Sequence, residues 1–418
     1  MAAMDPECTI YRDFAADVLA NILTRLPPNT RRRLRLVCRH WRDVVGTRTP
    51  TNLRSRAKTL VAAWGSTYVY GDLSASRKPL WADHRTSRRY EGMSVVGTCN
   101  GLVCFYDDRE IGDTIVVANP VTGEALSVPP LPLTRAVDRS RRHIRTWRWA
   151  YSFAYLPTSG RYKVVHVPSP IGQFVSDAVH VFTLGEASWR AVPAGRAARC
   201  DDLDYSVVSV DGVTYWSTPE GAEKVFSFEL EHERVTPITS LPYVLSDSEN
   251  GGGWQLAEVH GRLAIVFSHA SPEMSTTQVW VMEGATGQVS WSLWYIVQMS
   301  TPSDRPGKPP NKKIKELTWP LFVHGEHILT WETEWPIHRG YSLCMHTPIH
   351  DTRKAKHGLL DISKRNRGMV VTNFKISIGG QTFAYVETEE PHFDDLEIHF
   401  GVAETISEFD GNIYFSLN

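Results

Sequence analysis

Several polar residues in the sequence have types and spacings that could support chemistry. Cys99 and Cys104 flank a short turn and could supply half of a zinc site, which needs two more ligands at matching spacing. His324 and His327 also lie on either side of a turn, and Asp201, Asp202 and Asp204 could work as general acid and base. None of these groups has the further partners that its chemistry requires. We therefore interpret the cysteines as core residues and the others as parts of polar turns.

Motifs of the common catalytic sites are missing from the sequence. We find no glycine-rich phosphate loop, no nucleophile elbow and no HExxH pair. No motif in the sequence therefore indicates a catalytic residue, a cofactor site or a metal site.

Apolar residues near the start of the chain predict two short amphipathic helices. The first carries apolar residues at spacings of three and four and ends at two prolines: Val18, Leu19, Ile22, Leu23, Leu26, Pro27 and Pro28. The second carries one apolar face and ends at a glycine: Leu34, Val37, Cys38, Trp41, Val44, Val45 and Gly46. A hairpin this short does not bury both apolar faces by itself, so we expect a partner to cover them.

This hairpin resembles an F-box, the motif by which adaptor proteins dock onto the Skp subunit of Skp–cullin–F-box ubiquitin ligases. The matching residues are Asp17-Val18-Leu19, Ile22-Leu23, Leu26-Pro27, Arg33, Leu34, Val37-Cys38 and Trp41. The sequence departs from the pattern at Ala15, where a proline is usual, and at Arg31 and Arg32, where apolar residues are common. The resemblance implies that Skp is bound by Phe14, Val18, Leu19, Ile22, Leu23, Leu26, Pro27, Pro28, Leu34, Val37, Cys38 and Trp41. The alternative is an ordinary hairpin packed on its own domain.

Length and composition indicate a globular chain with a small and a large domain. The chain has 418 residues, of which 42% are hydrophobic, and a net charge of −1. It has no secretory signal and no apolar stretch long enough to span a membrane, so we expect no membrane partner. The six cysteines are scattered, which favours a reducing compartment, and we expect a cytoplasmic or nuclear location.

Basic residues are concentrated near the start of the chain. Residues 1–60 contain 12 Lys and Arg against 5 Asp and Glu. Arginines clustered on a helix could bind nucleic acid, could attract an acidic protein, or could simply be solvated. The F-box resemblance favours an acidic protein partner, because the Skp subunit of that family is acidic.

A repeated pair of apolar strands around a glycine turn predicts the architecture of the large domain. The turn glycines are Gly101, Gly160, Gly212, Gly261, Gly325 and Gly380, at spacings of roughly fifty residues. A second strand pair follows most of these units, so each repeat makes a four-stranded sheet. This pattern is typical of a kelch-type β-propeller of six blades, and a large β-sandwich is the alternative.

Three segments make the resemblance to a known family closer. Cys99-Asn-Gly-Leu-Val-Cys, Asn119-Pro-Val-Thr-Gly-Glu and Val128-Pro-Pro-Leu-Pro resemble, in that order, the first repeat of the plant F-box-associated domain. Paired glycines of true kelch repeats occur only at Gly251–Gly253 and Gly379-Gly380, so we describe the domain as kelch-like.

The sequence therefore predicts a small all-α F-box hairpin followed by a large all-β domain. We expect a disordered tail at 1–10, the F-box at 11–46, a connector at 47–66 and a propeller at 67–418 with a disordered loop at 300–316. Tyr68–Trp81 should join C-terminal strands to close the ring, because open sheet edges are avoided. A hairpin at Ile406–Leu417 would raise the blade count to seven.

The resemblance implies a non-catalytic function, which is the recruitment of a target protein to a cullin-type ubiquitin ligase. We expect a monomer within the complex that contacts the Skp adaptor, through it the cullin, and a target whose identity is not legible in the sequence. The alternative is a propeller enzyme or a carbohydrate- or ligand-binding module with an incidental helical arm.

Overall fold

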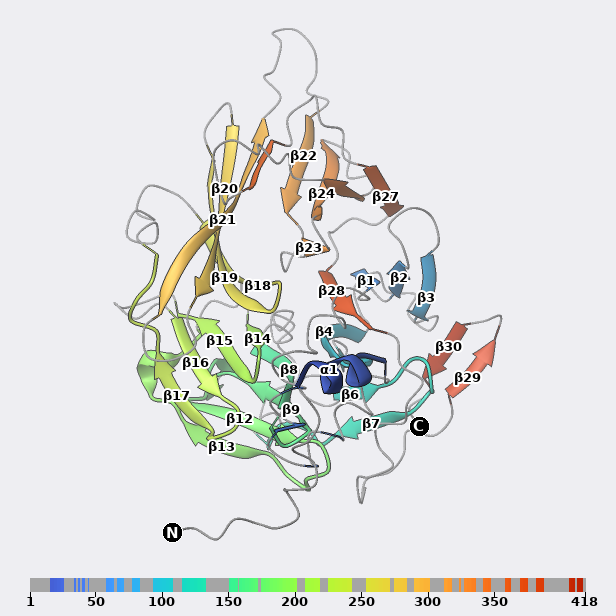
Figure 1. Cartoon of the computed structure of the whole chain (residues 1–418), viewed down its shortest axis with the longest axis vertical. Helices are drawn as coiled ribbons and strands as arrows, with labels where there is room; N and C mark the ends of the chain where they lie inside the picture. Colours follow the sequence, from blue (N-terminus) through green and yellow to red (C-terminus); the bar gives the residue numbers. More distant parts are fainter. Residues whose placement is uncertain are drawn as a thin grey trace, which may run out of the picture.

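The computed structural model describes one short helix near the start of the chain and thirty strands (Figure 1). The described residues are 16–25, 34, 37, 40, 41, 44, 58–63, 66–70, 77–82, 93–107, 115–132, 150–156, 158–171, 174–200, 207–218, 225–242, 253–270, 274–283, 289–300, 312–317, 323–324, 327–335, 341–346, 358–361, 369–374, 381–386, 406–409 and 412–415. Within these ranges, no helix is long and apolar enough to cross a lipid bilayer.

The helix α1 (Ala16–Arg25) forms because its apolar residues follow a helical period. Leu19 and Leu23 lie one turn apart on the same stripe, and both are buried against Val44. The described positions Leu34 and Trp41 pack at the edge of this small core and have helical backbone. The N-terminal region therefore has a core of its own.

The first three blades of the large domain are antiparallel sheets, each built from one continuous stretch of chain. Blade 1 contains β4 (Met93–Cys99), β5 (Leu102–Asp107), β6 (Ile115–Ala118) and β7 (Ala125–Val128). Blade 2 contains β8 (Tyr151–Leu156), β9 (Arg161–His166), β12 (Ala178–Thr183) and β13 (Arg190–Pro193). Blade 3 contains β14 (Val208–Val210), β15 (Val213–Ser217), β16 (Val225–Glu229) and β17 (Arg234–Pro237). In each blade the strands pair in chain order.

Blades 4 and 5 are larger, five-stranded sheets. Blade 4 contains β18 (Gly253–Val259), β19 (Arg262–Ala270), β20 (Met274–Glu283) and β21 (Ser290–Ser300), and β26 (Gly358–Asp361) pairs with β21 in parallel. Blade 5 contains β22 (Lys312–Leu317), β23 (Val323–His324), β24 (His327–Trp335), β25 (Tyr341–His346) and β27 (Met369–Phe374). Both β22 and β23 pair with β24.

A further four-stranded sheet, here called the closing sheet, joins the two ends of the propeller. It contains β1 (Lys58–Ala63), β2 (Ser66–Tyr70), β3 (Arg77–Ala82) and, paired with β1, β28 (Gln381–Tyr385). The predicted closure by N-terminal strands is therefore confirmed. The direct partner of the C-terminal strand is β1, which lies in the range 47–66 that we expected to be a connector.

The sheets succeed one another around a common centre, as Figure 1 shows, and the first strands of neighbouring sheets lie side by side: β28 beside β4, β4 beside β8, β8 beside β14, and β14 beside β18. The apolar core is divided among the seams between sheets. One cluster joins blades 1 and 2 through residues such as Leu102 and Phe182, and another joins blades 2 and 3 through Val165 and Phe228. This is the arrangement of a propeller and not of a two-layered sandwich.

The predicted count of six repeating blades is wrong, because the sixth predicted hairpin is divided between two sheets. Phe374 ends β27 in blade 5, whereas the strand that follows, Gln381–Tyr385, belongs to the closing sheet. The repeats therefore form five blades in succession, and the remaining sheet is assembled from both chain ends. A strand that could pair with distant β1 had no local signal to distinguish it from a hairpin arm.

Two other segments differ from the expectation. The range 300–316, predicted to be disordered, includes Ser300 at the end of β21 and Lys312–Glu316 within β22; its middle lies outside the described residues. The predicted seventh inner hairpin exists as β29 (Ile406–Phe409) and β30 (Asn412–Phe415), but these strands pair only with each other. Two further short strands, β10 (Pro170–Ile171) and β11 (Phe174–Val175), and the 3-10 helix η5 (Arg196–Ala198) lie in the connections after β9 and β13.

The turns follow from local residue chemistry. Asn100 and Gly101 both have positive φ, 54° and 89°, between β4 and β5, which is the pair of left-handed residues that a two-residue hairpin turn requires. Between β6 and β7, buried Asn119 accepts a hydrogen bond at Oδ1 from the Val121 amide, 3.0 Å away. Thr122 Oγ1 donates to Glu124 Oε2 at 2.8 Å. The Asn-Pro-Val-Thr-Gly-Glu motif is therefore a self-contained turn.

Candidate functional site

The residues that the sequence suggested for catalysis do not form a site. Cys99 is half-buried and accepts a hydrogen bond from Asn100 Nδ2 at 3.4 Å, whereas Cys104 is fully buried and burial raises the pKa of its thiol far above the usual value. His324 and His327 lie opposite each other across β23 and β24. Residues 201–204 lie outside the described part of the chain. Across the described residues, no three His, Cys, Asp or Glu side chains gather closely enough to hold a metal.

An exposed apolar surface on the F-box hairpin is the first candidate site. Val18 and Ile22 lie one turn apart on α1 and are 51% and 44% exposed, and Val37 is 43% exposed. These are the large hydrophobic side chains that the described structure leaves exposed. Exposed apolar groups gathered on one small domain mark a site of protein contact.

The other predicted Skp-binding residues lie in different environments. Leu19 and Leu23, which belong to the set that the resemblance implies for Skp binding, are already buried against Val44 in the isolated chain. Leu34 and Trp41 are half-buried beside them. Phe14, Leu26, Pro27, Pro28 and Cys38 lie outside the described residues. The helical period predicted an apolar helix, but only the fold distinguished its internal stripe from its exposed one.

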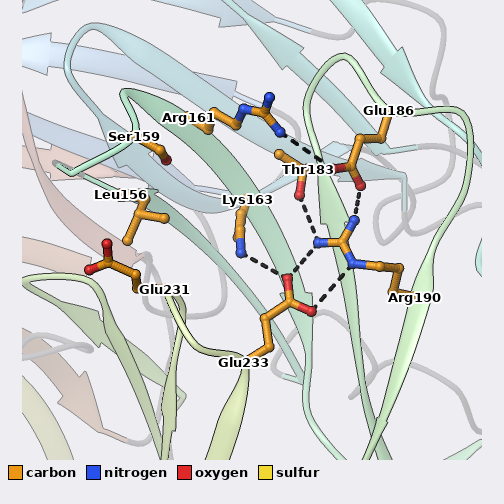
Figure 2. A pocket seen from close by; sticks show the side chains of 9 residues that line it. All are labelled: Leu156, Ser159, Arg161, Lys163, Thr183, Glu186, Arg190, Glu231 and Glu233. Atoms are coloured by element: carbon orange, nitrogen blue, oxygen red, sulfur yellow. Dashed lines mark hydrogen bonds and ion pairs between the residues drawn. The ribbon is translucent and has the colours of Figure 1, made fainter. Parts of the chain in front are cut away.

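A polar pocket between blades 2 and 3 is the second candidate site, and sequence inspection did not find it. Figure 2 shows the charged side chains that converge there from β9, the β12–β13 turn, β13 and the β16–β17 turn. The pocket has a volume of about 470 Å³ and is lined by Leu156, Ser159, Arg161, Lys163, Thr183, Glu186, Arg190, Glu231 and Glu233.

An ion-pair network forms one wall of this pocket. Lys163 Nζ donates to the Leu230 carbonyl oxygen at 2.5 Å and to Glu233 Oε1 at 2.9 Å. Arg190 donates to both oxygens of Glu233, with Nε 3.3 Å from Oε2, and its Nη2 donates to Thr183 Oγ1 at 3.0 Å. Arg190 also pairs with Glu186. Two cations of blade 2 therefore hold one carboxylate of blade 3.

The electrostatics of the network follow from this geometry. Lys163 is buried, with only 6% of its surface exposed, and its charge is compensated by Glu233. Burial raises the pKa of Glu233, but hydrogen bonds and charges from Arg190 and Lys163 lower it more, so the net pKa lies below the ordinary value. Glu233 is therefore ionised at neutral pH. Lys163 and Glu233 are 70 positions apart in the sequence. A sequence motif consists of neighbouring residues, so no motif predicts this network.

Comparison with known proteins agrees with the fold. A family model described as an F-box associated beta propeller domain matches residues 72–333, and one described as an F-box domain matches residues 14–52. Among curated Arabidopsis thaliana proteins, the F-box protein At3g07870 is 25% identical over 363 residues, which cover 76% of this chain and 82% of the relative. The F-box/LRR-repeat protein At2g43260 is 22% identical over 314 residues, which cover 69% of this chain and 68% of the relative.

The two matches fall on the two parts of the structure. The F-box match includes α1 with the exposed Val18 and Ile22, and the propeller match extends from β3 into β24, so it covers blades 1 to 3, strands β18–β21 of blade 4 and the first strands of blade 5. The first segment resembles a docking motif, and the second forms the repeated sheets that the glycine turns predicted. On these grounds, the chain belongs to the family of plant F-box proteins that carry an F-box-associated β-propeller domain.

Proposed function

We propose that this chain is the non-catalytic, substrate-recruiting subunit of a Skp–cullin–F-box ubiquitin ligase. The observation that carries the proposal is that three apolar side chains within the matched F-box, Val18, Ile22 and Val37, are exposed. In this proposal the surface docks onto a Skp-family adaptor, which connects the chain to a cullin. The propeller then holds the target protein.

Docking through this surface is supported by simple energetics. Complete burial of one valine or isoleucine side chain contributes roughly 1.5–3 kcal/mol, so three half-exposed side chains offer about half of that each. The buried residues Leu19 and Leu23 anchor α1 against Val44, which leaves Val18 and Ile22 on the exposed side of the helix. The predicted contacts of Leu34 and Trp41 remain part of the proposal as edges of the same surface.

In the proposed complex the chain breaks and forms no bond. It contributes by placing the lysines of a target near the charged conjugating enzyme, which raises the effective concentration of the reacting groups. A ring of rigid sheets suits this role because it presents its loops at fixed positions. We further propose that the chain works as one copy per complex, that its propeller is kelch-like, and that it acts in the cytoplasm or the nucleus.

The test is co-expression of the full chain with a plant Skp protein, followed by affinity capture and size-exclusion chromatography. We expect an equimolar complex, and we expect a variant that begins at residue 54, which keeps β1–β3 and lacks the F-box, to elute without Skp. If the full chain and the shortened variant retain the same amount of Skp, docking does not use the F-box and the proposal fails.

A further inference from the structure

The seam between blades 1 and 2 is filled by a tryptophan. Trp189 directly precedes β13, is buried, and packs on Phe182 and Tyr151. Its Nε1 donates to the Pro129 carbonyl oxygen of blade 1 at 2.7 Å. In a similar way Trp291 of blade 4 donates to the Ser240 carbonyl oxygen, which follows the last strand of blade 3, at 2.7 Å. Indoles at or just before the start of a fourth strand therefore close two seams by donating to a carbonyl oxygen of the preceding blade.

The seam between blades 2 and 3 is built differently. Glu233 directly precedes β17, so it has the position in blade 3 that Trp189 has in blade 2. A carboxylate is much smaller than an indole, and it reaches back to Lys163 and Arg190 instead of a backbone carbonyl. The remaining space is the pocket of Figure 2. The hollow therefore lies where blade 3 has a carboxylate at the position that the bulky Trp189 has in blade 2.

Four charged side chains of the pocket compensate one another and form one wall, whereas two others, here called the open groups, are Glu231 and Arg161. Lys163, Arg190, Glu186 and Glu233 compensate one another through the network described above. Glu231 is exposed and, within the described part of the chain, makes no ion pair or hydrogen bond. The Arg161 side chain is 60% exposed and, among the residues that the structure describes, pairs with Glu186 alone, at 3.6 Å. One carboxylate and one guanidinium therefore remain for a ligand, on different elements of the pocket.

We propose that this pocket recognises a segment of the target protein that carries a basic side chain close to an acidic one. In this proposal Glu231 accepts hydrogen bonds from the lysine or arginine of the target, and Arg161 binds its carboxylate. Ser159, which is exposed in the β8–β9 turn, forms a hydrogen bond through its hydroxyl with the backbone of the segment. The inference rests on the proposed function, since it assigns the target-holding role to one pocket.

The composition of the pocket argues against a simple anion as its ligand. Both cations of the wall, Lys163 and Arg190, already donate to carboxylates, and an added phosphate would approach Glu186 and Glu233. A charged segment of both signs avoids this repulsion, because each of its groups meets an open group of opposite sign. The volume of about 470 Å³ is within the range of small-ligand sites, and it can accept a long side chain and its neighbours.

The experiment is selection from a random peptide library displayed on phage, with the full chain immobilised. We expect enriched peptides to contain Lys or Arg within a few positions of Asp or Glu. The variant Glu231→Lys should lose the preference for the basic residue, and Arg161→Glu should lose the preference for the acidic one. For one enriched peptide, calorimetry should show that each reversal weakens binding tenfold or more and that Glu231→Gln weakens it by less.

The controls separate this proposal from the function on which it rests. Arg196→Glu reverses the charge of an exposed arginine, as Arg161→Glu does, but Arg196 lies in η5 outside the pocket. The affinity of this variant for the peptide should stay within twofold of the parent affinity. Thermal melting shows whether each variant is folded, and Glu231→Gln keeps the test valid if a reversal unfolds the chain. A library that gives no charged consensus, or a consensus that both reversals leave unchanged, overturns the proposal. Failure to bind Skp would instead overturn the docking role, and the selection does not depend on Skp.

Discussion

Leu60 in β1 lies directly opposite Phe383 in β28, although these residues come from opposite ends of the propeller sequence. Leu60 is fully buried and belongs, with Tyr385, to a core cluster that continues into blade 1 through Phe105. Thr98 Oγ1 of β4 also donates to the Ala384 carbonyl oxygen at 2.5 Å. The C-terminal strand is therefore held on both sides, by the N-terminal strands and by the first blade.

We expect removal of the N-terminal strands to open the ring. A fragment of residues 84–418 lacks β1–β3, so β28 would lose its paired strand and expose its edge. This fragment should form aggregates on size-exclusion chromatography and melt at a lower temperature than the full chain.

The matched control for this truncation is the fragment of residues 54–418, which loses the F-box but keeps β1–β3. It should remain monomeric and should keep the melting transition of the propeller. A monomeric 84–418 fragment with unchanged melting would show that the closing sheet does not stabilise the ring.

The exposed apolar surface of the F-box can be tested separately from the small core beneath it. Ile22→Asp and Val37→Asp should each reduce Skp binding tenfold or more in a quantitative pulldown. In the proposed complex the new carboxylate would be buried against Skp without a partner, and burial of an unpaired charge is unfavourable. Both residues are about half exposed, so the variants should keep the far-UV circular dichroism of the parent. Leu23→Ala is the contrasting change: it should destabilise the hairpin by about 2–5 kcal/mol. Undiminished Skp binding by both aspartate variants would exclude this surface as the docking site.

The ion pair between Lys163 and Glu233 should contribute to stability mainly by compensating a buried charge. Glu233→Gln should destabilise the propeller, because Lys163 remains buried with one fewer anion nearby. We expect a loss of roughly 1–3 kcal/mol, at the lower end for buried ion pairs, because solvent partly screens the exposed part of Glu233. Lys163→Met with Glu233→Gln should cost less than the two single changes together. Urea denaturation of the four proteins of this cycle gives the coupling energy. Strictly additive effects would mean that the two side chains do not stabilise each other.

Buried histidines should make the propeller sensitive to acid. His166 of β9 lies opposite His180 of β12, with ring centroids 6.0 Å apart, and the Nδ1 atoms of both are buried with no hydrogen-bond partner in the structure. Burial, and then the neighbouring His180, lower the pKa of His166 to about 3, whereas an unfolded histidine has a pKa of about 6.5. The unfolded chain therefore takes up this proton first as the pH falls. The stability due to neutral His166 is complete above about pH 6.5 and decreases toward pH 3, by about 1.4 kcal/mol per pH unit.

Urea midpoints measured between pH 7.5 and pH 5 test this expectation in a range where the carboxylates remain ionised. His166→Phe should reduce the loss of stability on acidification, because it removes the group that must stay neutral. The control is His232→Gln, which removes an exposed histidine of the β16–β17 turn, outside the buried pair. Equal slopes for the parent and for His166→Phe would contradict the assignment.

The sequence by itself determined the local features of this protein. The two-residue turn at Asn100-Gly101, the Asn119–Glu124 turn and the apolar period of Ala16–Arg25 each depend on the φ angles or side chains of a few neighbouring residues. A turn or a single helix needs no distant partner to be recognised. Repetition of such units therefore indicated the propeller, and the matched residues of the hairpin indicated the F-box.

The tertiary structure decided which of these units meet. Leu19 and Ile22 are both apolar residues of one helix, yet only packing against Val44 made the first internal and left the second exposed. Sequence patterning placed Gln381–Tyr385 in a local hairpin, whereas the ring required it to pair with β1. The pocket depends on Lys163 and Glu233 meeting across a seam. Pairings between distant residues are fixed by burial and by closure of the ring, and a local sequence pattern carries no information about either.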